Sequence, residues 1–183
     1  IASYSELDRG CIGVIRKILH DFSGRNNAVL HPVPISTHEY DSDVRTIQEL
    51  MKGYDDGSDG GRSLDSPHKV IKQIGSCRIV VTGSYHAAVF ALAQGISAVA
   101  LAKSEYYIGK FLGVKEQFGG GCEVVLFDKQ LRDNLLAGIE RAWSEADQIR
   151  PQLLEAAKRQ ISLSRGAYRR IYEIVEDLEL TEE

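Results

Sequence analysis

The chain has 183 residues, a formal net charge of −4 at pH 7 and an apolar content of 43%. This length is enough for one domain with a substantial core, and the composition is that of an ordinary globular protein. A nucleic-acid-binding domain would more often be basic. The longest apolar stretch, residues 87–102, is interrupted by Gln94-Gly95 and is shorter than the ~18 residues that span a bilayer. We therefore expect neither a nucleic-acid partner nor a membrane span.

The three cysteines, Cys11, Cys77 and Cys122, include no Cys-x-x-Cys pair. Cys77 and Cys122 lie at the starts of apolar runs, which indicates reduced, buried thiols and a cytoplasmic protein. No pair of histidines or cysteines has the spacing of metal ligands. The sequence thus predicts no metal site, and it contains no pattern that points to a cofactor.

The first part of the chain begins with an amphipathic helix. Apolar residues recur at helical spacing over residues 6–22, and the segment Gly24–Asn27 is typical of a helix end. Residues 28–35 then form an extended run. Because Pro32 and Pro34 cannot donate to a strand ladder, we expect regular strand pairing to stop just before them.

A loop over residues 36–40 leads to a helix that Asp41 or Ser42 can cap and that ends near Met51. The following segment, residues 53–66, contains four glycines and four aspartates. Such a composition predicts a flexible surface loop that could act as a lid. We expect it to be the most mobile internal segment, because it has little apolar surface to bury.

Strands alternate with helices in the second part of the chain. The pattern predicts a short helix at 66–74, a strand at 78–82, a helix at 85–94, a strand at 97–102, a helix at 105–112, a glycine turn at 118–121 and a strand at 123–127. Two long helices should follow, one over residues 129–147 after a cap at Asp128, and one from Pro151 to about Glu179. This alternation favours an α/β fold with a Rossmann-like parallel sheet and helices on both faces.

The polar trio Ser84-Tyr85-His86 follows a predicted strand and begins a predicted helix. Open α/β sheets bind ligands at the carboxyl ends of their parallel strands, so this turn is the expected site. In the simplest interpretation, Ser84 caps the helix and the two rings pack. In the functional interpretation, the free N–H groups of the helix start and the Ser84 hydroxyl hold an anion, and His86 is a general acid or base.

Lys103, Tyr106, Tyr107 and Lys110 follow the next strand and should lie at the same edge of the sheet. Two lysines and two tyrosines suit an anionic ligand that carries a ring or a sugar. The alternative is a solvated helix face, which explains Lys110 and Tyr107 better than Lys103, because Lys103 follows the strand directly.

His38 could line the same edge together with Asp41 and Asp43, although an aspartate there is more often a cap and a single histidine more often packs. The glycine run Gly119–Gly121 is not a phosphate loop. It lacks the following Lys-Ser/Thr and precedes a strand instead of a helix.

From Gly83 to Ile96 the chain reads Gly-Ser-Tyr-His-Ala-Ala-Val-Phe-Ala-Leu-Ala-Gln-Gly-Ile, and a predicted strand lies on either side of this segment. After the second strand come Tyr106-Tyr107, then Lys110, and then the pair Leu112-Gly113. Over roughly residues 28–127 this arrangement resembles the C-terminal domain of the polysaccharide pyruvyl transferase family. The resemblance implies a GT-B-like enzyme in which two Rossmann-like domains face a cleft. Residues 1–183 would be a single domain, the C-terminal half, with its first strand and an N-terminal domain lying before residue 1.

This family transfers a pyruvyl group from phosphoenolpyruvate to a sugar hydroxyl of a polysaccharide, where it forms a ketal. Its typical motif is Arg-Leu-His followed by Ala. His86 and Ala87 match this motif, whereas Tyr85 takes the Leu place and Ser84 takes the Arg place. The difference matters because an arginine binds a phosphate or carboxylate through two parallel hydrogen bonds, and a serine offers one neutral hydrogen bond.

The resemblance also implies roles for the polar residues. His86 would act as acid or base or would bind the donor carboxylate, and Ser84 with the helix start would hold donor oxygens. Lys103 and Lys110 would neutralise phosphate, with Tyr85 beside them.

Two alternatives stay open. One is a nucleotide-sugar glycosyltransferase on the same scaffold, with Tyr106 or Tyr107 near the base or sugar. The other is a non-catalytic carbohydrate-binding or scaffold domain that has lost its arginine. If the cleft needs both domains, residues 1–183 alone should be inactive, and a homo-oligomer is compatible with the pattern.

Overall fold

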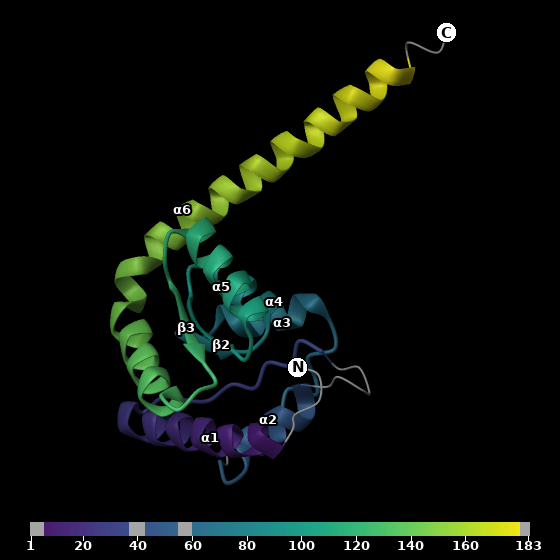
Figure 1. Cartoon of the computed structure of the whole chain (residues 1–183). Helices are drawn as coiled ribbons and strands as arrows, with labels where there is room; N and C mark the ends of the chain where they lie inside the picture. Colours follow the sequence, from purple (N-terminus) through teal and green to yellow (C-terminus); the bar gives the residue numbers. More distant parts are fainter. Residues whose placement is uncertain (1–5, 37–42, 55–59, 180–183) are drawn as a thin grey trace.

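The computed structural model describes residues 6–36, 43–54 and 60–179. These residues form a three-stranded parallel sheet with helices packed around it (Figure 1). The strands are β1 (Ile79–Thr82), β2 (Ser97–Ala102) and β3 (Cys122–Leu126), and they lie side by side in chain order. The predicted α/β class and the parallel, Rossmann-like arrangement are therefore confirmed.

Strand β2 is the centre of the sheet and pairs with both neighbours. Val81 of β1 lies opposite Val99, and Ala100 lies opposite Val124 of β3. The helices α4 (Tyr85–Leu92) and α5 (Glu105–Phe118) make the two crossovers between the strands. Since both faces of a central parallel strand are covered, β2 reads as an almost unbroken apolar run and is nearly all buried.

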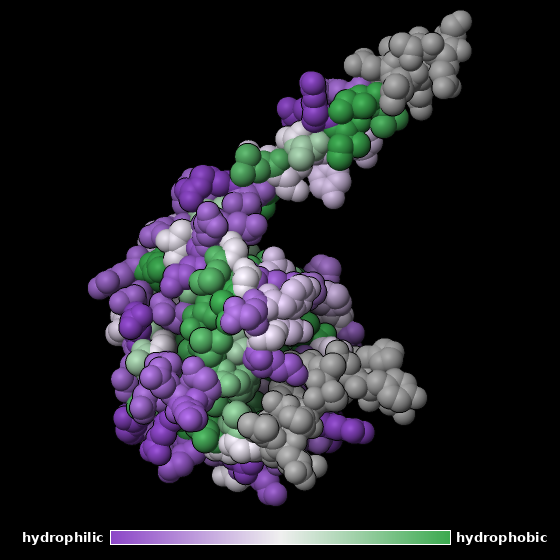
Figure 2. Space-filling view, viewed as in Figure 1, coloured by the Kyte–Doolittle hydropathy of each residue, from purple (hydrophilic) through white to green (hydrophobic). Residues whose placement is uncertain are grey.

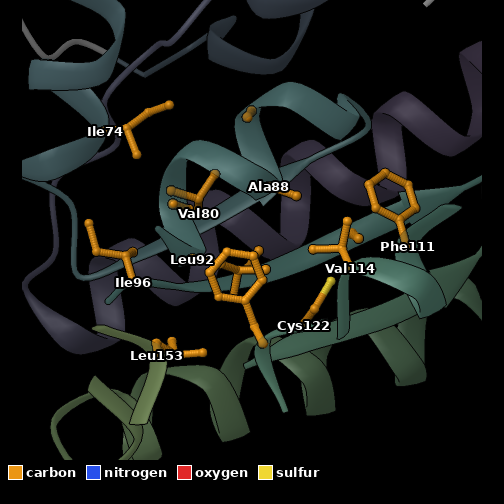
Figure 3. Close-up of a cluster of buried hydrophobic side chains, with 14 of the residues drawn as sticks. Ile74, Val80, Ala88, Leu92, Ile96, Phe111, Val114, Cys122 and Leu153 are labelled. Atoms are coloured by element: carbon orange, nitrogen blue, oxygen red, sulfur yellow. The ribbon is translucent and has the colours of Figure 1, made fainter. Parts of the chain in front are cut away.

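Two hydrophobic clusters cover the two faces of the sheet. On one face, α3 (Pro67–Gly75), α4 and α5 pack through a cluster that includes Ile74, Leu92, Phe111 and Leu153 (Figure 3). On the other face lie α1 (Glu6–Asn26) and the first half of α6 (Leu131–Glu179), and α2 (Asp43–Met51) packs on α1. Helices on both faces, as expected, place the carboxyl ends of the strands at one edge between these layers.

The two long C-terminal helices predicted from the sequence are one helix, α6, which is 49 residues long and contains Pro151. Proline lacks an N–H and crowds the preceding turn, so it was expected to start a new helix. The helix continues because the next turn is held in the core: Leu153 and Ala156 are completely buried. Figure 1 shows that α6 follows the body in its first half and projects away from it in its second.

The extended run at residues 28–35 does not join the sheet in the part of the chain that the structure describes, so the expected strand pairing there is wrong. Two of its backbone N–H groups, and that of the residue after it, bind side chains instead. The Leu30 N–H donates to the Tyr54 hydroxyl (3.1 Å), and the N–H groups of Ile35 and Ser36 both donate to Asp43 Oδ2 (2.9 Å each).

The other helix and strand ends lie within about one helical turn of the predicted ends, except the end of α5. The α5 helix continues past the expected end at residue 112 because Val114 and Phe118 extend its buried stripe, and Gly119 ends it in the left-handed conformation (φ 72°). His38 and the candidate caps Asp41 and Ser42 lie outside the described residues. So do residues 55–59, and the expected mobility of the segment 53–66 stays a prediction. In the described segments, no helix is long and apolar enough to cross a bilayer.

Cys122 begins β3 within the core and is a free thiol (Figure 3). Burial raises the pKa of this thiol to about 11. At pH 8, iodoacetamide should therefore alkylate Cys122 only after the protein is unfolded in urea, because the reactive thiolate is suppressed and covered. Mass spectrometry of the labelled peptides measures this. Equal labelling of Cys122 in the native and unfolded protein would contradict its burial.

The same raised pKa predicts how stability changes at alkaline pH. The thiol of the unfolded chain loses its proton at lower pH than the thiol of the folded chain. The contribution of Cys122 to the free energy of unfolding is therefore fully present below about pH 9 and decreases as the pH rises toward 11.

Candidate functional site

A pocket of about 110 Å³ lies at the carboxyl ends of the strands, on the side of α1 and α2. The wall that the described residues form is mostly apolar, and four of their side chains bring polar atoms to it. The lining residues are Ile12, Ile15, Leu19, Val33, Ile35, Asp43, Thr46, Ile47, Leu50, Val81, Thr82, Gly83, Ser84, Leu101 and Phe127. Ser84 is thus the member of the expected polar trio that lines this pocket.

The turn Thr82-Gly83-Ser84 joins β1 to α4 and forms one wall of the pocket. The Ser84 N–H donates to Thr82 Oγ1 at 2.9 Å, which fixes the turn. Ser84 occupies the N-cap position of α4 with an extended backbone (φ −93°, ψ 126°), but its hydroxyl makes no capping hydrogen bond. The interpretation of Ser84 as a simple capping serine is therefore wrong, and its hydroxyl is available to a ligand.

The start of α4 adds the positive end of a helix to the same wall. The first N–H groups of any α-helix lack partners within the helix, and they carry partial positive charge. In α4 these groups belong to residues 85–87, immediately after the pocket turn. An anionic oxygen beside Ser84 would meet a neutral hydroxyl and these backbone donors.

The opposite side of the pocket contains Asp43 and Thr46, both at the start of α2. Asp43 is held by the two backbone N–H groups of the 35–36 segment, and its own N–H donates to the Ser36 carbonyl at 2.9 Å. The sequence indicated Asp43 only as a neighbour of His38 and did not indicate Thr46. The spacing of the two residues, three apart on a helix, is the signal that could have found the pair.

A second group of side chains gathers where α4 and α5 begin, and we call it the Lys110 cluster: Tyr85, Tyr106, Tyr107 and Lys110. The Lys110 ammonium lies 4.6 Å from the centre of the Tyr106 ring, 5.4 Å from that of Tyr85 and 6.0 Å from that of Tyr107. The tyrosines at 106 and 107 meet edge to face at 5.4 Å. A hydrogen bond with Tyr106 raises the pKa of Lys110, so this lysine is a cation at neutral pH.

His86 lies in the first turn of α4, and its ring is exposed. It contacts the edge of Tyr85 (5.9 Å between ring centres) and Phe90 (6.4 Å). Within the described ranges, no hydrogen bond or ion pair engages the imidazole, so both ring nitrogens can exchange protons with a ligand or with water.

The structure brings some of the expected site residues together and separates others. The Lys110 cluster is in mutual contact, and His86 joins it through Tyr85. Ser84 lies next to them in the chain but faces the pocket. Lys103 is exposed directly after β2, outside the pocket wall, and His38 lies outside the described residues.

Comparison with protein families supports the resemblance that the motif at the end of β1 indicated. A family model described as Polysaccharide pyruvyl transferase matches residues 1–105, which include the Ser84 turn, His86 and Lys103 but end just before Tyr106. Comparisons with curated proteins and with solved structures gave no match. Because the matched region covers more than half of the chain, this chain belongs to the polysaccharide pyruvyl transferase family.

Proposed function

We propose that this chain is the donor-binding half of an enzyme that transfers pyruvyl from phosphoenolpyruvate to a sugar hydroxyl of a surface polysaccharide. Membership in the family indicates a pyruvyl transferase-like function with a small-molecule and a saccharide substrate. The observation that carries the donor assignment is the Ser84 hydroxyl. It makes no capping bond and lines a pocket beside the free N–H groups of α4.

The proposed donor has two anionic groups, a carboxylate and a phosphate. The start of α4 and the Ser84 hydroxyl would bind oxygens of one of them, as helix starts commonly do. Lys110 and Lys103 would supply the positive charge that the family places in an arginine at position 84. Asp43 disfavours an anion on the far side of the pocket, so the anionic groups should lie toward α4 and α5.

His86 would move the protons of the reaction. The enol double bond of the donor must gain a proton at its terminal carbon, and one acceptor hydroxyl must lose a proton as its oxygen bonds to the central carbon. A second hydroxyl of the sugar must then lose its proton as its oxygen replaces phosphate on that carbon, which closes the ketal and releases phosphate. An exposed imidazole with no internal partner in the described residues can serve either step. Tyr85, which contacts both His86 and Lys110, would hold the two groups relative to each other.

A nucleotide-sugar donor is the second candidate, because the Tyr106 side chain is 64% exposed and offers a ring on which a base could stack. The ammonium of Lys110 over this ring favours an anionic group at the same place. A protein that binds neither donor would fit the non-catalytic alternative.

Calorimetric titration distinguishes these candidates. We expect phosphoenolpyruvate to bind, and we expect Ser84→Ala to weaken its binding about two- to tenfold, the effect of one neutral hydrogen bond. Ser84→Arg should strengthen binding about tenfold or more, because it restores a charge-assisted, two-bond contact. The matched control is Ser104→Ala. Ser104 holds the same N-cap position at α5, likewise without a capping hydrogen bond, but it lies outside the pocket wall.

Two other binding results would favour the alternative functions. Binding of a nucleotide sugar such as UDP-glucose without binding of phosphoenolpyruvate would favour a glycosyltransferase. Binding of neither would favour a non-catalytic domain. We also propose that the second wall of the cleft belongs to an N-terminal domain. Residues 1–183 alone should therefore bind the donor without transferring its pyruvyl group. We also propose that the protein acts in the cytoplasm.

A further inference from the structure

Tyr106 presents an exposed ring at the carboxyl edge of the sheet, in the first turn of α5. The residue is 64% exposed, although two neighbours contact its ring. Tyr107 meets the ring edge to face at 5.4 Å between centres, and the Lys110 ammonium lies 4.6 Å from the ring centre. Since the ring remains this exposed with both neighbours in place, it offers a flat surface to a ligand.

The neighbours of Tyr106 are themselves held in place. Tyr107 is half-buried and packs against the hydrophobic cluster that covers this face of the sheet, and its ring lies 6.5 Å from that of the buried Phe111. Lys110 reaches Tyr85 of α4 and also forms a hydrogen bond with Tyr106. A ring that its neighbours already order loses little conformational freedom when a ligand packs on it.

Tyr106 differs in its position from the other exposed tyrosines. In the described part of the chain, three tyrosines are 64% exposed or more. Two of them, Tyr168 and Tyr172, lie in the second half of α6, which projects away from the body (Figure 2). Tyr106 is thus the exposed tyrosine that lies beside the candidate site.

A chain of contacts joins Tyr106 to the groups that the proposed function places in the reaction. The Lys110 ammonium lies over the Tyr106 ring and, at 5.4 Å, over the Tyr85 ring. The Tyr85 ring contacts that of His86, and Tyr85 directly follows Ser84 of the pocket turn. A ligand on Tyr106 would therefore lie next to a donor that is bound at Ser84.

The chemistry of ketal formation requires the acceptor sugar close to the donor. Two hydroxyls of one sugar must reach the central carbon of the donor, so the sugar ring must lie directly beside it. A pyranose ring has C–H groups on its faces, which pack on an aromatic ring, and hydroxyls around its rim. An ammonium and an imidazole can donate hydrogen bonds to such hydroxyls. Tyr106, Lys110 and His86 therefore offer a suitable contact to each part of a sugar.

We propose that the acceptor sugar lies on the Tyr106 ring, with its hydroxyls toward Lys110 and His86. This inference rests on the proposed function, from which it takes the saccharide substrate and the place of the donor. The family match ends at residue 105, so it includes the donor turn and leaves Tyr106 unassigned. Because a flat ring contacts the C–H face of a sugar without reading each hydroxyl, it should accept pyranosides that carry a ketal-forming pair of hydroxyls.

Saturation-transfer NMR on the whole chain tests this contact, with methyl β-D-glucopyranoside as the probe. All ring substituents of this sugar are equatorial, so both of its faces carry C–H groups, and its 4- and 6-hydroxyls can form a cyclic ketal. Saturation should reach the axial protons of one face more strongly than those of the other. Tyr106→Ala should weaken binding about two- to tenfold, the effect of losing one stacked ring, and Tyr106→Phe should retain it.

Tyr168→Ala is the matched control. Tyr168 is also 64% exposed on a helix, but it lies in the second half of α6, so its replacement should leave the pyranoside signal unchanged. All three variants should unfold at about the wild-type temperature, because both tyrosines are exposed.

Titration of the wild-type chain with phosphoenolpyruvate separates this inference from the proposed function. If the donor binds but the pyranoside gives no signal up to about 50 mM, or gives equal signals in Tyr106→Ala and Tyr168→Ala, the acceptor contact is wrong and the donor site stands. If the pyranoside binds through Tyr106 and the donor does not bind, the sugar contact stands and the donor assignment fails. A Tyr106-dependent signal from uridine that the pyranoside does not give would mean that the ring stacks a base, and it would overturn the inference.

Discussion

Replacing Phe111 with alanine should lower the free energy of unfolding by about 3–5 kcal/mol, the usual loss when a large buried ring is removed. Phe111 is completely buried in α5 and belongs to the cluster that joins α4 and α5 to the sheet (Figure 3). Its ring also lies 6.5 Å from that of Tyr107. Removing it leaves a cavity that the neighbouring helices cannot close without disturbing β2.

The next residue in the chain provides the control. Leu112 is half exposed in the same turn of the same helix. Leu112→Ala should therefore change the free energy of unfolding by about 0.5 kcal/mol or less. Urea denaturation followed by circular dichroism measures both variants. A loss below about 1 kcal/mol for Phe111→Ala, or equal losses for the two variants, would mean that α5 does not pack as described.

The sheet could be predicted from the sequence because its strands are short apolar runs separated by helices with clear ends. The run from Ala98 to Ala102 is apolar throughout, and a strand that is covered on both faces needs that pattern. The run at residues 28–35 looked similar but did not pair. Its backbone partners, the Tyr54 hydroxyl and the Asp43 carboxylate, come from elsewhere in the chain, and local pattern does not reveal such partners.

The helix break expected at Pro151 shows the same limit. The local rule is sound, since proline removes one hydrogen bond of the helix. The core contacts of Leu153 and Ala156 outweigh that local cost, and they depend on how α6 lies against α4 and α5. Local helix propensity therefore predicts a helix end poorly where packing holds the residues on both sides of a proline in place.

The candidate site could be predicted only where neighbours in the sequence are also neighbours in space. Tyr106, Tyr107 and Lys110 share one face of α5 because they are spaced by three and four residues. The contact of Lys110 with Tyr85 follows from the parallel order of β1 and β2, which the alternation of elements already indicated. The far wall of the pocket comes from α1 and α2. The sequence indicated only Asp43 there, because the other lining residues of these helices are mostly apolar and have the spacing of an ordinary core-facing stripe.

In the full-length enzyme that we propose, His86→Ala should lower pyruvyl transfer by roughly 10²-fold or more, the range typical for loss of a general acid or base. The loss should appear mainly in kcat, because an acid or base acts in the transition state and adds little to ground-state binding. The thermal unfolding temperature should not change, since the His86 ring is exposed and contacts only the edges of the cluster.

His68→Ala is the control for this experiment. His68 is likewise exposed and likewise lies in the first turn of a helix, α3, but it belongs to neither the pocket nor the Lys110 cluster. Its replacement should leave transfer within about twofold of the wild-type rate. If His86→Ala instead unfolds at a lower temperature while the folded fraction keeps full activity, His86 is a packing residue. The proton would then have to be moved by another group at the carboxyl edge of the sheet, and Lys110 is the nearest candidate because it shares the ring of Tyr85 with His86.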